Sequence, residues 1–170
     1  MKKKTFLTAC VGAAMGLLTS CGARAQMPEG RLLSIEYVRS GMMAGYEYHG
    51  LLETTDNGDV LLTSMTEKFG EASRLKVDEQ TLQRFRDIIK EEKIYNYARD
   101  YSPPFEVLDG YGWHLYIRFE GGKSIESSGH NATPGGEGLT RLRSLMTELV
   151  KSEKAVRLDE NRARVFVFGR

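Results

Sequence analysis

The chain has 170 residues, the size of one ordinary domain. Hydrophobic residues make up 41% and charged residues 28%, and the mean hydropathy is −0.39, so intrinsic disorder and a polytopic membrane protein are both disfavoured. A formal net charge of +1 gives no electrostatic reason to expect nucleic acid as a partner, and two cysteines exclude a disulfide-rich scaffold.

The first residues have the composition of a targeting segment. Lys2, Lys3 and Lys4 form a cationic start, and residues 6–18 are apolar and uncharged. Such a stretch has the length of a signal-peptide core and is too short to span a bilayer as a helix. We therefore expect residues 1–20 to be a cleaved signal peptide.

Four residues at the end of this leader, Leu18-Thr19-Ser20-Cys21, resemble the lipobox of bacterial lipoproteins. The resemblance implies cleavage between Ser20 and Cys21, a diacylglyceryl thioether on Cys21, and a further acyl chain such as palmitate on the new amino group. Several chains anchor a protein stably, because each buried CH₂ contributes about 0.8 kcal/mol. Glycine rather than aspartate at position 22 favours the outer membrane, by analogy with the sorting rule of Gram-negative lipoproteins. The alternative is a secretory signal with an incidental cysteine.

Cys10 lies in the apolar part of the leader and would be removed with it, so the mature chain would keep only Cys21 and form no intrachain disulfide. Residues 21–30 would be a lipidated tether, because residues 22–30 are small or polar, lack periodicity and reach at most about 30 Å. The remaining residues, 31–170, are expected to form a single domain close to the membrane, facing the periplasm or the cell surface.

Alternating hydrophobicity predicts that the domain starts with strands. Leu33, Ile35 and Tyr37 mark the buried face of the first strand, and residues 41–45 form a turn. One face of the second strand carries Tyr46, Tyr48 and Leu52. The other face carries Glu47, His49, Leu51 and Glu53.

A hairpin is predicted at Asn57-Gly58, because this dipeptide suits the positive φ angles of a two-residue type I′ turn. Such a turn pairs Leu52 with Thr63. It also places Leu61 on the buried face of the following strand.

Two amphipathic helices are predicted. After a short strand at 72–77, Asp78 has the position of an N-cap and begins a helix that ends near Lys93. The second helix runs from Glu137 to about Lys154. Their apolar stripes consist of Leu82, Phe85, Ile88 and Ile89 in the first helix, and of Leu139, Leu142, Met146, Leu149 and Val150 in the second.

The clearest strand, residues 112–119, lies between these helices and follows an irregular loop at 95–110. One face of this strand carries Trp113, Leu115, Ile117 and Phe119. The other face carries His114, Tyr116 and Arg118. A three-residue loop with Gly122 in the left-handed region pairs Ile117 with Ile125, and we favour it over a two-residue turn. A last strand is expected at 165–168.

This order of elements predicts an α+β domain with a single antiparallel sheet and both amphipathic helices packed on one face. Two hairpin-plus-helix units give the order a loose topological similarity to the tandem arrangement of beta-lactamase-inhibitor-like domains. Residues 109–134 resemble a stretch that recurs in small uncharacterised lipoproteins of the bacterial envelope, and this resemblance implies no known chemistry.

The histidines are the main candidates for chemistry. His49 and His114 fall on the polar faces of their strands, with Glu47 and Glu53 nearby, so a His/His/Glu metal patch would form if these strands were neighbours. No HExxH or cysteine-based spacing supports such a site, and solvated histidines on an exposed sheet face explain the same pattern. We expect no metal site.

Ser127, Ser128 and His130 bring hydroxyl groups close to an imidazole in the sequence. A serine hydrolase also needs a nucleophile elbow and an acid that orients the base, and the chain has no GxSxG. A turn at Asn131 that leads into the last helix explains the same residues. The sequence therefore predicts no catalytic residue and no cofactor.

Aromatic residues crowd the segment 95–116, where they either line a sugar- or peptide-binding groove or cover the open end of the sheet. The candidate binding surface consists of Tyr111, His114, Tyr116, Arg118, His130 and Asn131.

The leader and the absence of a recognisable catalytic constellation together predict a membrane-anchored envelope lipoprotein that acts as a non-enzymatic interaction or ligand-binding module. Beyond the membrane, its partner would be an envelope protein or a glycan. The alternative is a small hydrolase or metal-dependent enzyme that uses His130, or His49 with His114.

Overall fold

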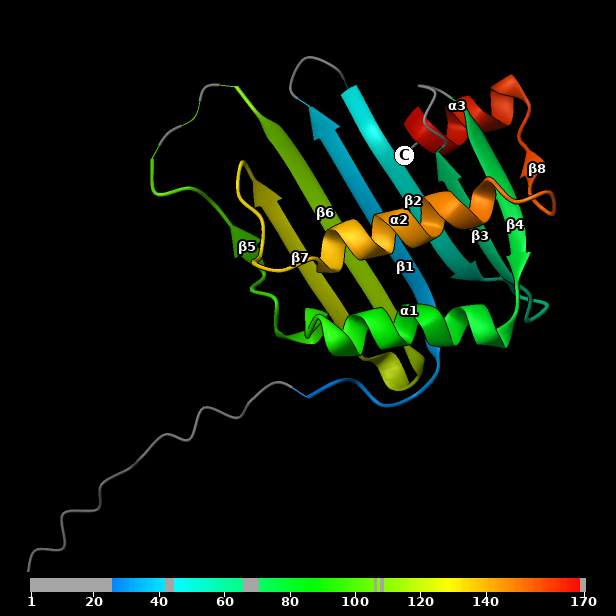
Figure 1. Ribbon diagram of the computed structural model, residues 1–170, viewed down its shortest axis with the longest axis horizontal. Helices are drawn as coiled ribbons and strands as arrows, with labels where there is room; N and C mark the ends of the chain where they lie inside the picture. Colours follow the sequence, from blue (N-terminus) through cyan, green and yellow to red (C-terminus); the bar gives the residue numbers. More distant parts are fainter. Residues whose placement is uncertain (1–25, 42–44, 66–70, 106, 108, 169–170) are drawn as a thin grey trace, which may run out of the picture.

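Figure 1 shows the computed structural model, which describes residues 26–41, 45–65, 71–105, 107 and 109–168. These residues form an α+β fold with one mixed sheet of eight strands and three helices. The predicted signal peptide, its cleavage site, Cys21 and the middle of the predicted turn at 41–45 lie outside the described residues. No helix in the described ranges is long and apolar enough to cross a membrane.

The strands follow the order β5-β7-β6-β1-β2-β3-β4-β8 across the sheet. Their bounds are β1 Leu32–Gly41, β2 Gly45–Thr54, β3 Val60–Met65, β4 Ala72–Val77, β5 Asp100–Tyr101, β6 Tyr111–Phe119, β7 Ser124–His130 and β8 Val156–Arg157. The strand expected at 72–77 is confirmed.

The expectation of a purely antiparallel sheet is wrong at one edge. β5 and β7 run parallel and pair Asp100 with Ser128, whereas the other neighbouring strands are antiparallel. β5 has two residues and lies within the stretch expected to be a loop. So short a strand leaves no alternating pattern in the sequence.

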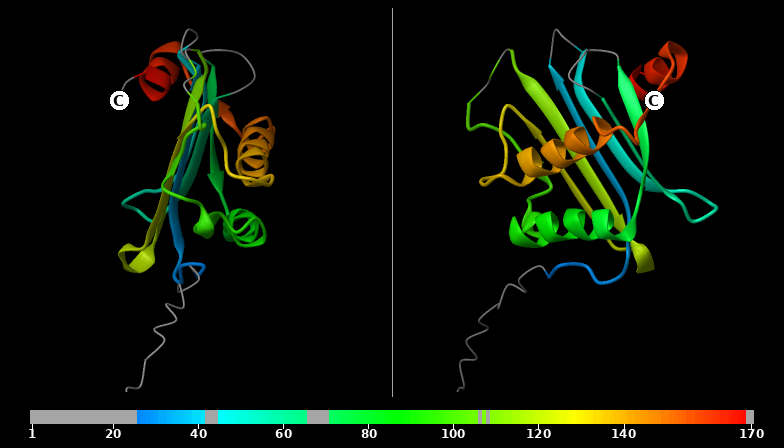
Figure 2. Two further views of the ribbon diagram at one scale, coloured as in Figure 1. Left: turned by 90° about the vertical axis from the view of Figure 1, so that its left-hand side faces the viewer. Right: turned by 45° about the vertical axis from the view of Figure 1, so that its right-hand side comes forward.

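Helices α1 (Glu79–Glu91) and α2 (Gly138–Val150) cross the same face of the sheet, which we call the inner face (Figure 2, left). Asp78 caps α1 as predicted, because its Oδ1 accepts a hydrogen bond of 2.8 Å from the backbone N–H of Thr81. α1 ends before the predicted Lys93, which has a left-handed backbone with φ of 51°. α2 likewise ends before the predicted Lys154.

The core lies between these two helices and the inner face. The helices bury the stripes predicted for them, except that α2 also buries Leu145 and leaves Leu149 partly exposed. The predicted inner face of β6 is confirmed, since Trp113, Leu115, Ile117 and Phe119 are all buried. The three-residue loop after β6 is confirmed as well, because Ile117 pairs with Ile125 and Gly122 has φ of 75°.

The first strand departs from the predicted alternation. Its pairing with β6 shifts register between Leu32 and Ser34, so an extra residue, Leu33, is accommodated there. As a result Leu32 and not Leu33 is fully buried in the core. Ile35 and Tyr37 face the core as predicted.

The β2–β3 hairpin has a longer loop than the predicted two-residue turn. The backbone N–H of Thr55 bonds the carbonyl oxygen of Asp59 at 2.8 Å, which closes the loop outside the Asn-Gly dipeptide. Leu52 therefore pairs with Leu62 rather than with Thr63. Leu62 takes the buried position expected for Leu61.

A β-bulge near the start of β2 reverses two predicted faces. Arg39 of β1 pairs with Tyr48, and the next pair skips Glu47 and reaches Tyr46. Tyr46 consequently stacks with His49 on the side of the sheet opposite α1 and α2, with ring centroids 6.4 Å apart. The carboxylate of Glu47 instead binds Nε of Arg39 at 2.9 Å.

Helix α3 (Glu160–Phe168) replaces the strand expected at 165–168 and lies on the opposite face, which we call the outer face (Figure 2, left). The side chain of Asp159 accepts a hydrogen bond of 2.9 Å from the backbone N–H of Arg162, as an N-cap does. Alternating Val and Phe residues favour a strand, but this cap and the burial of Ala163 belong to a helix. The face expected to be free of helices is therefore partly covered.

Candidate functional site

His49 is buried on the outer face beneath α3. Its Nε2 lies 3.1 Å from Oε1 of Glu36, and its Nδ1 lies 2.9 Å from the backbone carbonyl oxygen of Phe166. The imidazole also stacks on the Phe166 ring, with centroids 4.2 Å apart. Nδ1 thus helps to hold α3 and Nε2 is engaged by Glu36 of β1, so each ring nitrogen already has a partner within the fold.

His114 shares the outer face with His49, but the two do not form a site. Each pairs with Val38 from opposite sides, so β1 separates them by two strand spacings, about 9–10 Å. Nε2 of His114 lies 3.8 Å from Oε1 of Glu126, and Glu47 is turned toward Arg39. Within the described ranges, no three His, Cys, Asp or Glu side chains are grouped so as to hold a metal ion.

The serines near His130 are engaged elsewhere. Ser127 is fully buried, and its hydroxyl donates to a backbone carbonyl oxygen at 2.7 Å. The hydroxyl of Ser128 also donates to a backbone carbonyl oxygen, at 3.3 Å. His130 is exposed, and its Nδ1 lies 3.5 Å from the side-chain amide of Asn131. These contacts belong to the end of a strand and do not form a catalytic triad.

Asn131 and two glycines have structural roles in the stretch 109–134. Asn131 has a left-handed backbone with φ of 52°, and its Oδ1 accepts a hydrogen bond of 2.9 Å from the first backbone N–H of β6. A Cβ on Gly110 would collide with the Asn131 side chain, and a Cβ on Gly129 would collide with the Trp113 indole. The distinctive residues of this stretch therefore close the ends of β6 and β7.

The six residues predicted to form one binding surface fall in three places. His114, Tyr116 and Arg118 lie on the outer face of β6, and His130 and Asn131 lie at the end of β7. Tyr111 alone lies beside the groove on the inner face, where its ring is 4.3 Å from Cζ of Arg39.

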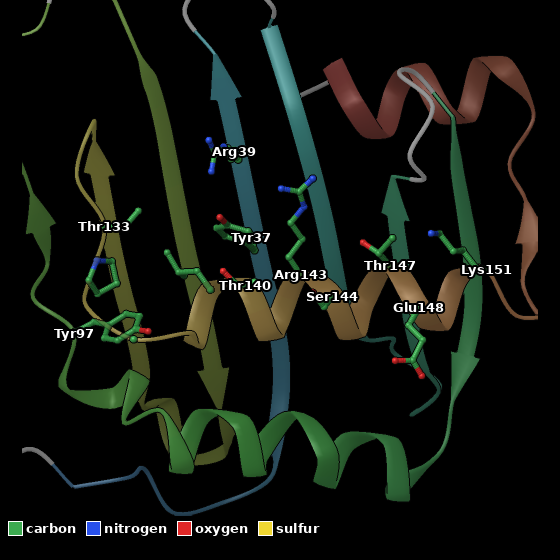
Figure 3. A pocket seen from close by; sticks show the side chains of 13 residues that line it. Tyr37, Arg39, Tyr97, Thr133, Thr140, Arg143, Ser144, Thr147, Glu148 and Lys151 are labelled. Atoms are coloured by element: carbon green, nitrogen blue, oxygen red, sulfur yellow. The ribbon is translucent and has the colours of Figure 1, made fainter.

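That groove, of about 640 Å³, is bounded by α2 and by the part of β1 that projects beyond it, where Tyr37 and Arg39 lie (Figure 3). α1 crosses one end of the sheet and α2 crosses its middle, so neither helix covers the other end (Figure 1). Tyr97, which follows α1, and Thr133, which precedes α2, close one end of the groove.

α2 lines the groove with a polar stripe. Its members recur every three or four residues and so share one face of the helix and of the C-cap residue that follows it; they are Thr140, Arg143, Ser144, Thr147, Glu148 and Lys151. All except Thr147 are exposed. The stripe lies next to the buried apolar stripe, so packing of α2 on the sheet fixes the position of the polar one.

Two arginines bring positive charge to the groove. Cζ of Arg143 lies 5.1 Å from the centroid of the Tyr48 ring, and Arg39 is held over Tyr111 in the same way. A cation–π contact restrains a guanidinium while its N–H groups stay available at the edge. Arg39 also pairs with Glu47, whereas in the described part of the chain no carboxylate lies within 4.0 Å of Arg143.

Tyr37 and Tyr97 add phenol groups to the groove (Figure 3). Burial raises the pKa of Tyr37, against the opposing effect of nearby Arg39 and Arg143. Burial also raises the pKa of Tyr97 to about 12, and the carboxylate of Glu92 adds to the increase. Both phenols are therefore protonated at neutral pH and can donate hydrogen bonds.

Sequence reasoning missed this groove because a polar stripe beside an apolar one is typical of every surface helix. The available signal was the composition of the stripe, in which hydroxyl and basic residues outnumber the single acid, Glu148. Its position against the projecting part of β1 depends on how α2 crosses the sheet. Comparison with family models, curated proteins and solved structures finds no match.

Proposed function

We propose that this protein is a lipid-anchored envelope protein that binds a ligand in the groove beside α2 and does not catalyse a reaction on it. The observation that carries the proposal is Arg143. Its guanidinium is held on the Tyr48 ring at the edge of a concave surface and, among the described residues, has no carboxylate within 4.0 Å. A positioned cation that lacks a counter-ion is suited to charge-assisted hydrogen bonds with a ligand.

The size and lining of the groove support the proposal. A volume of about 640 Å³ falls within the range of small-molecule sites, about 300–1,000 Å³. Such sites combine aromatic walls with a few placed polar groups. Here the partly exposed Tyr97 supplies a ring, the largely buried Tyr37 contributes to the lining, and Arg143 supplies the charge.

The position of the groove suits an anchored protein. The chain enters the sheet at the end of β1 that lies beside α1, and the groove lies beyond α2, toward the opposite end of the strands (Figure 1). With the lipid on Cys21, as the leader predicts, the tether would join the domain at the end of the sheet opposite to the groove. From the outer membrane the groove would open to the periplasm or to the cell surface.

The alternative, a hydrolase or metal-dependent enzyme, has less support. His49 holds α3, His114 lies on the outer face, and His130 contacts an amide. None of the three lines the groove. The binding proposal therefore fits the geometry better.

Photo-crosslinking in living cells tests the binding role. A benzoylphenylalanine residue is introduced at Ser144, in the groove, and at Glu126, on the outer face, as a matched exposed control. We expect a crosslinked product from the first position, lost when Arg143→Gln is added, and none from the second. Equal products from both positions, or none from Ser144, would contradict the proposal.

The anchor is tested separately. Cells that express the full chain are labelled with radioactive palmitate. We expect the label in the wild-type protein and its loss in Cys21→Ala. An unlabelled wild-type chain would refute the lipid anchor and leave the groove proposal standing.

A further inference from the structure

We propose further that the ligand of this groove is a carboxylated saccharide, whose carboxylate binds Arg143 and whose hydroxyl groups bind the surrounding polar side chains. This inference rests on the proposed function, because it names the ligand class of the same site.

The charge of the groove selects an anion. Arg39, Arg143 and Lys151 line it, and Glu148 is the one carboxylate among the described lining residues. Glu148 is itself paired with Arg84 at 3.6 Å. Positive charge concentrated at a concave surface attracts anionic ligands.

Arg143 fits a carboxylate best. A planar guanidinium presents paired N–H donors that match the two oxygens of a carboxylate. The Tyr48 ring restrains this guanidinium from one side, and Tyr48 is itself fixed by a hydrogen bond of 2.9 Å between its hydroxyl and that of Ser64. Arg39 has its Nε engaged by Glu47, which offsets its charge, so Arg143 makes the contact with the carboxylate.

The other side chains suit a ligand rich in hydroxyl groups. Thr133, Thr140 and Ser144 present exposed hydroxyls, and Tyr37 and Tyr97 present protonated phenols. Each of these groups can both donate and accept a hydrogen bond, as sugar hydroxyls do. An apolar ligand would cover them without replacing their bonds to water, at a cost in free energy.

The aromatic rings and the size of the groove agree with a saccharide. Tyr97, which is partly exposed, offers an apolar ring to the C–H face of a sugar and a hydroxyl to its polar edge. A groove of about 640 Å³ accommodates about one or two sugar rings. A folded protein partner needs a larger surface, about 800 Å² on each side of the interface.

The test compares two pairs of sugars. In each pair one member bears a carboxylate and the other is neutral. The isotope-labelled full chain, purified in detergent micelles, is titrated with D-galacturonic acid and D-galactose, and with N-acetylmuramic acid and N-acetylglucosamine. Backbone amide shifts are followed by NMR. We expect shifts around α2 and the projecting end of β1 with an acidic sugar, and binding of its neutral counterpart at least about tenfold weaker.

Variants assign the carboxylate contact to one side chain. Arg143→Gln keeps a polar, hydrogen-bonding side chain but removes the charge, and we expect it to weaken binding of the acidic sugar about 10- to 100-fold. Binding of the neutral sugar should be unchanged. Arg164→Gln on α3 is the control for loss of an exposed arginine, and it should bind like the wild type.

Four outcomes would overturn the inference. Equal binding of the acidic and neutral members of both pairs would exclude recognition of the carboxylate. Groove shifts with sodium acetate as strong as those with the acidic sugars would exclude recognition of the saccharide. Binding of an acidic tripeptide but of no sugar would assign the groove to peptides. The absence of amide shifts in the groove with every probe would exclude this ligand class. In each case a crosslinked product from Ser144 in cells would still support the proposed binding function.

Discussion

The two faces of the sheet hold their helices by different physical means. On the inner face, α1 and α2 bury nine large apolar side chains: Leu82, Phe85, Ile88, Ile89, Leu139, Leu142, Leu145, Met146 and Val150. On the outer face, α3 buries Ala163 and stacks Phe166 on His49, while Val165 stays 66% exposed. Burying one large apolar side chain contributes about 1.5–3 kcal/mol, so the inner helices are far more strongly attached.

This difference bears on function. The groove beside α2 is built on the strongly held face, so Arg143 projects from a helix whose position is fixed by the core. A rigid support keeps a binding group in place. The weakly held α3 is expected to open locally before the rest of the fold, because it has few buried apolar contacts.

The largest expected effect tests this comparison directly. Phe85 of α1 is fully buried, so Phe85→Ala should lower the free energy of unfolding by about 3–5 kcal/mol through lost burial and a residual cavity. Phe166→Ala on α3 should lower it by about 1 kcal/mol or less, because that ring is only partly buried. Urea unfolding followed by circular dichroism measures both. Equal losses would show that α3 belongs to the same cooperative core.

A smaller effect is expected from overpacking the inner face. A Cβ at Gly129 would collide with the Trp113 indole, so Gly129→Ala should lower the free energy of unfolding by about 1–3 kcal/mol. Gly135 has open space around its Cβ position, and Gly135→Ala is the matched control, with a change of about 0.5 kcal/mol or less. Thermal unfolding of both variants decides the matter. A neutral Gly129→Ala would mean that the Trp113 indole and the backbone carbonyl of Ala132 can both move away.

The inner face also predicts a loss of stability in alkali. Burial raises the pKa of Tyr48 to about 12, above the usual 10.0. Its contribution is therefore complete below pH 10 and is lost as the pH rises toward about 12, because unfolding releases a proton that the folded state retains. In Tyr48→Phe, urea unfolding at about pH 8 and about pH 11 should show a smaller alkaline loss than in the wild type. An identical loss in both proteins would contradict the role of Tyr48.

The smallest effect is expected on the outer face and concerns α3 alone. The Phe166 carbonyl can only accept, so Nδ1 of His49 carries a proton, and Nε2 faces the Glu36 carboxylate. His49→Gln removes the ring that stacks on Phe166 and cannot satisfy both contacts at once, so the protection of α3 amides from hydrogen exchange should fall. The protection of α1 and α2 amides should be unchanged. Equal protection of α3 in the variant and the wild type would contradict the role of His49.

Much of the fold could be predicted because its signals are local. Asp78 and the stripe from Leu82 to Ile89 lie within one helix, and Trp113 to Phe119 alternate within one strand. The bulge at Glu47 could not be predicted, since it depends on how β1 and β2 pair. The six residues of the predicted binding surface lie in three places for the same reason, because they were grouped by their distance in the sequence.

By itself, the sequence determined which segments form α1, α2 and β6, and it supplied the leader that predicts a lipid anchor. Periods of two and 3.6 residues express the geometry of single strands and helices, so they can be read without knowing the neighbours. The tertiary structure alone decided that Arg143 lies over Tyr48 and that His49 holds α3. Those contacts join residues far apart in the chain, and they exist only because the packing of the apolar stripes sets where each helix crosses the sheet.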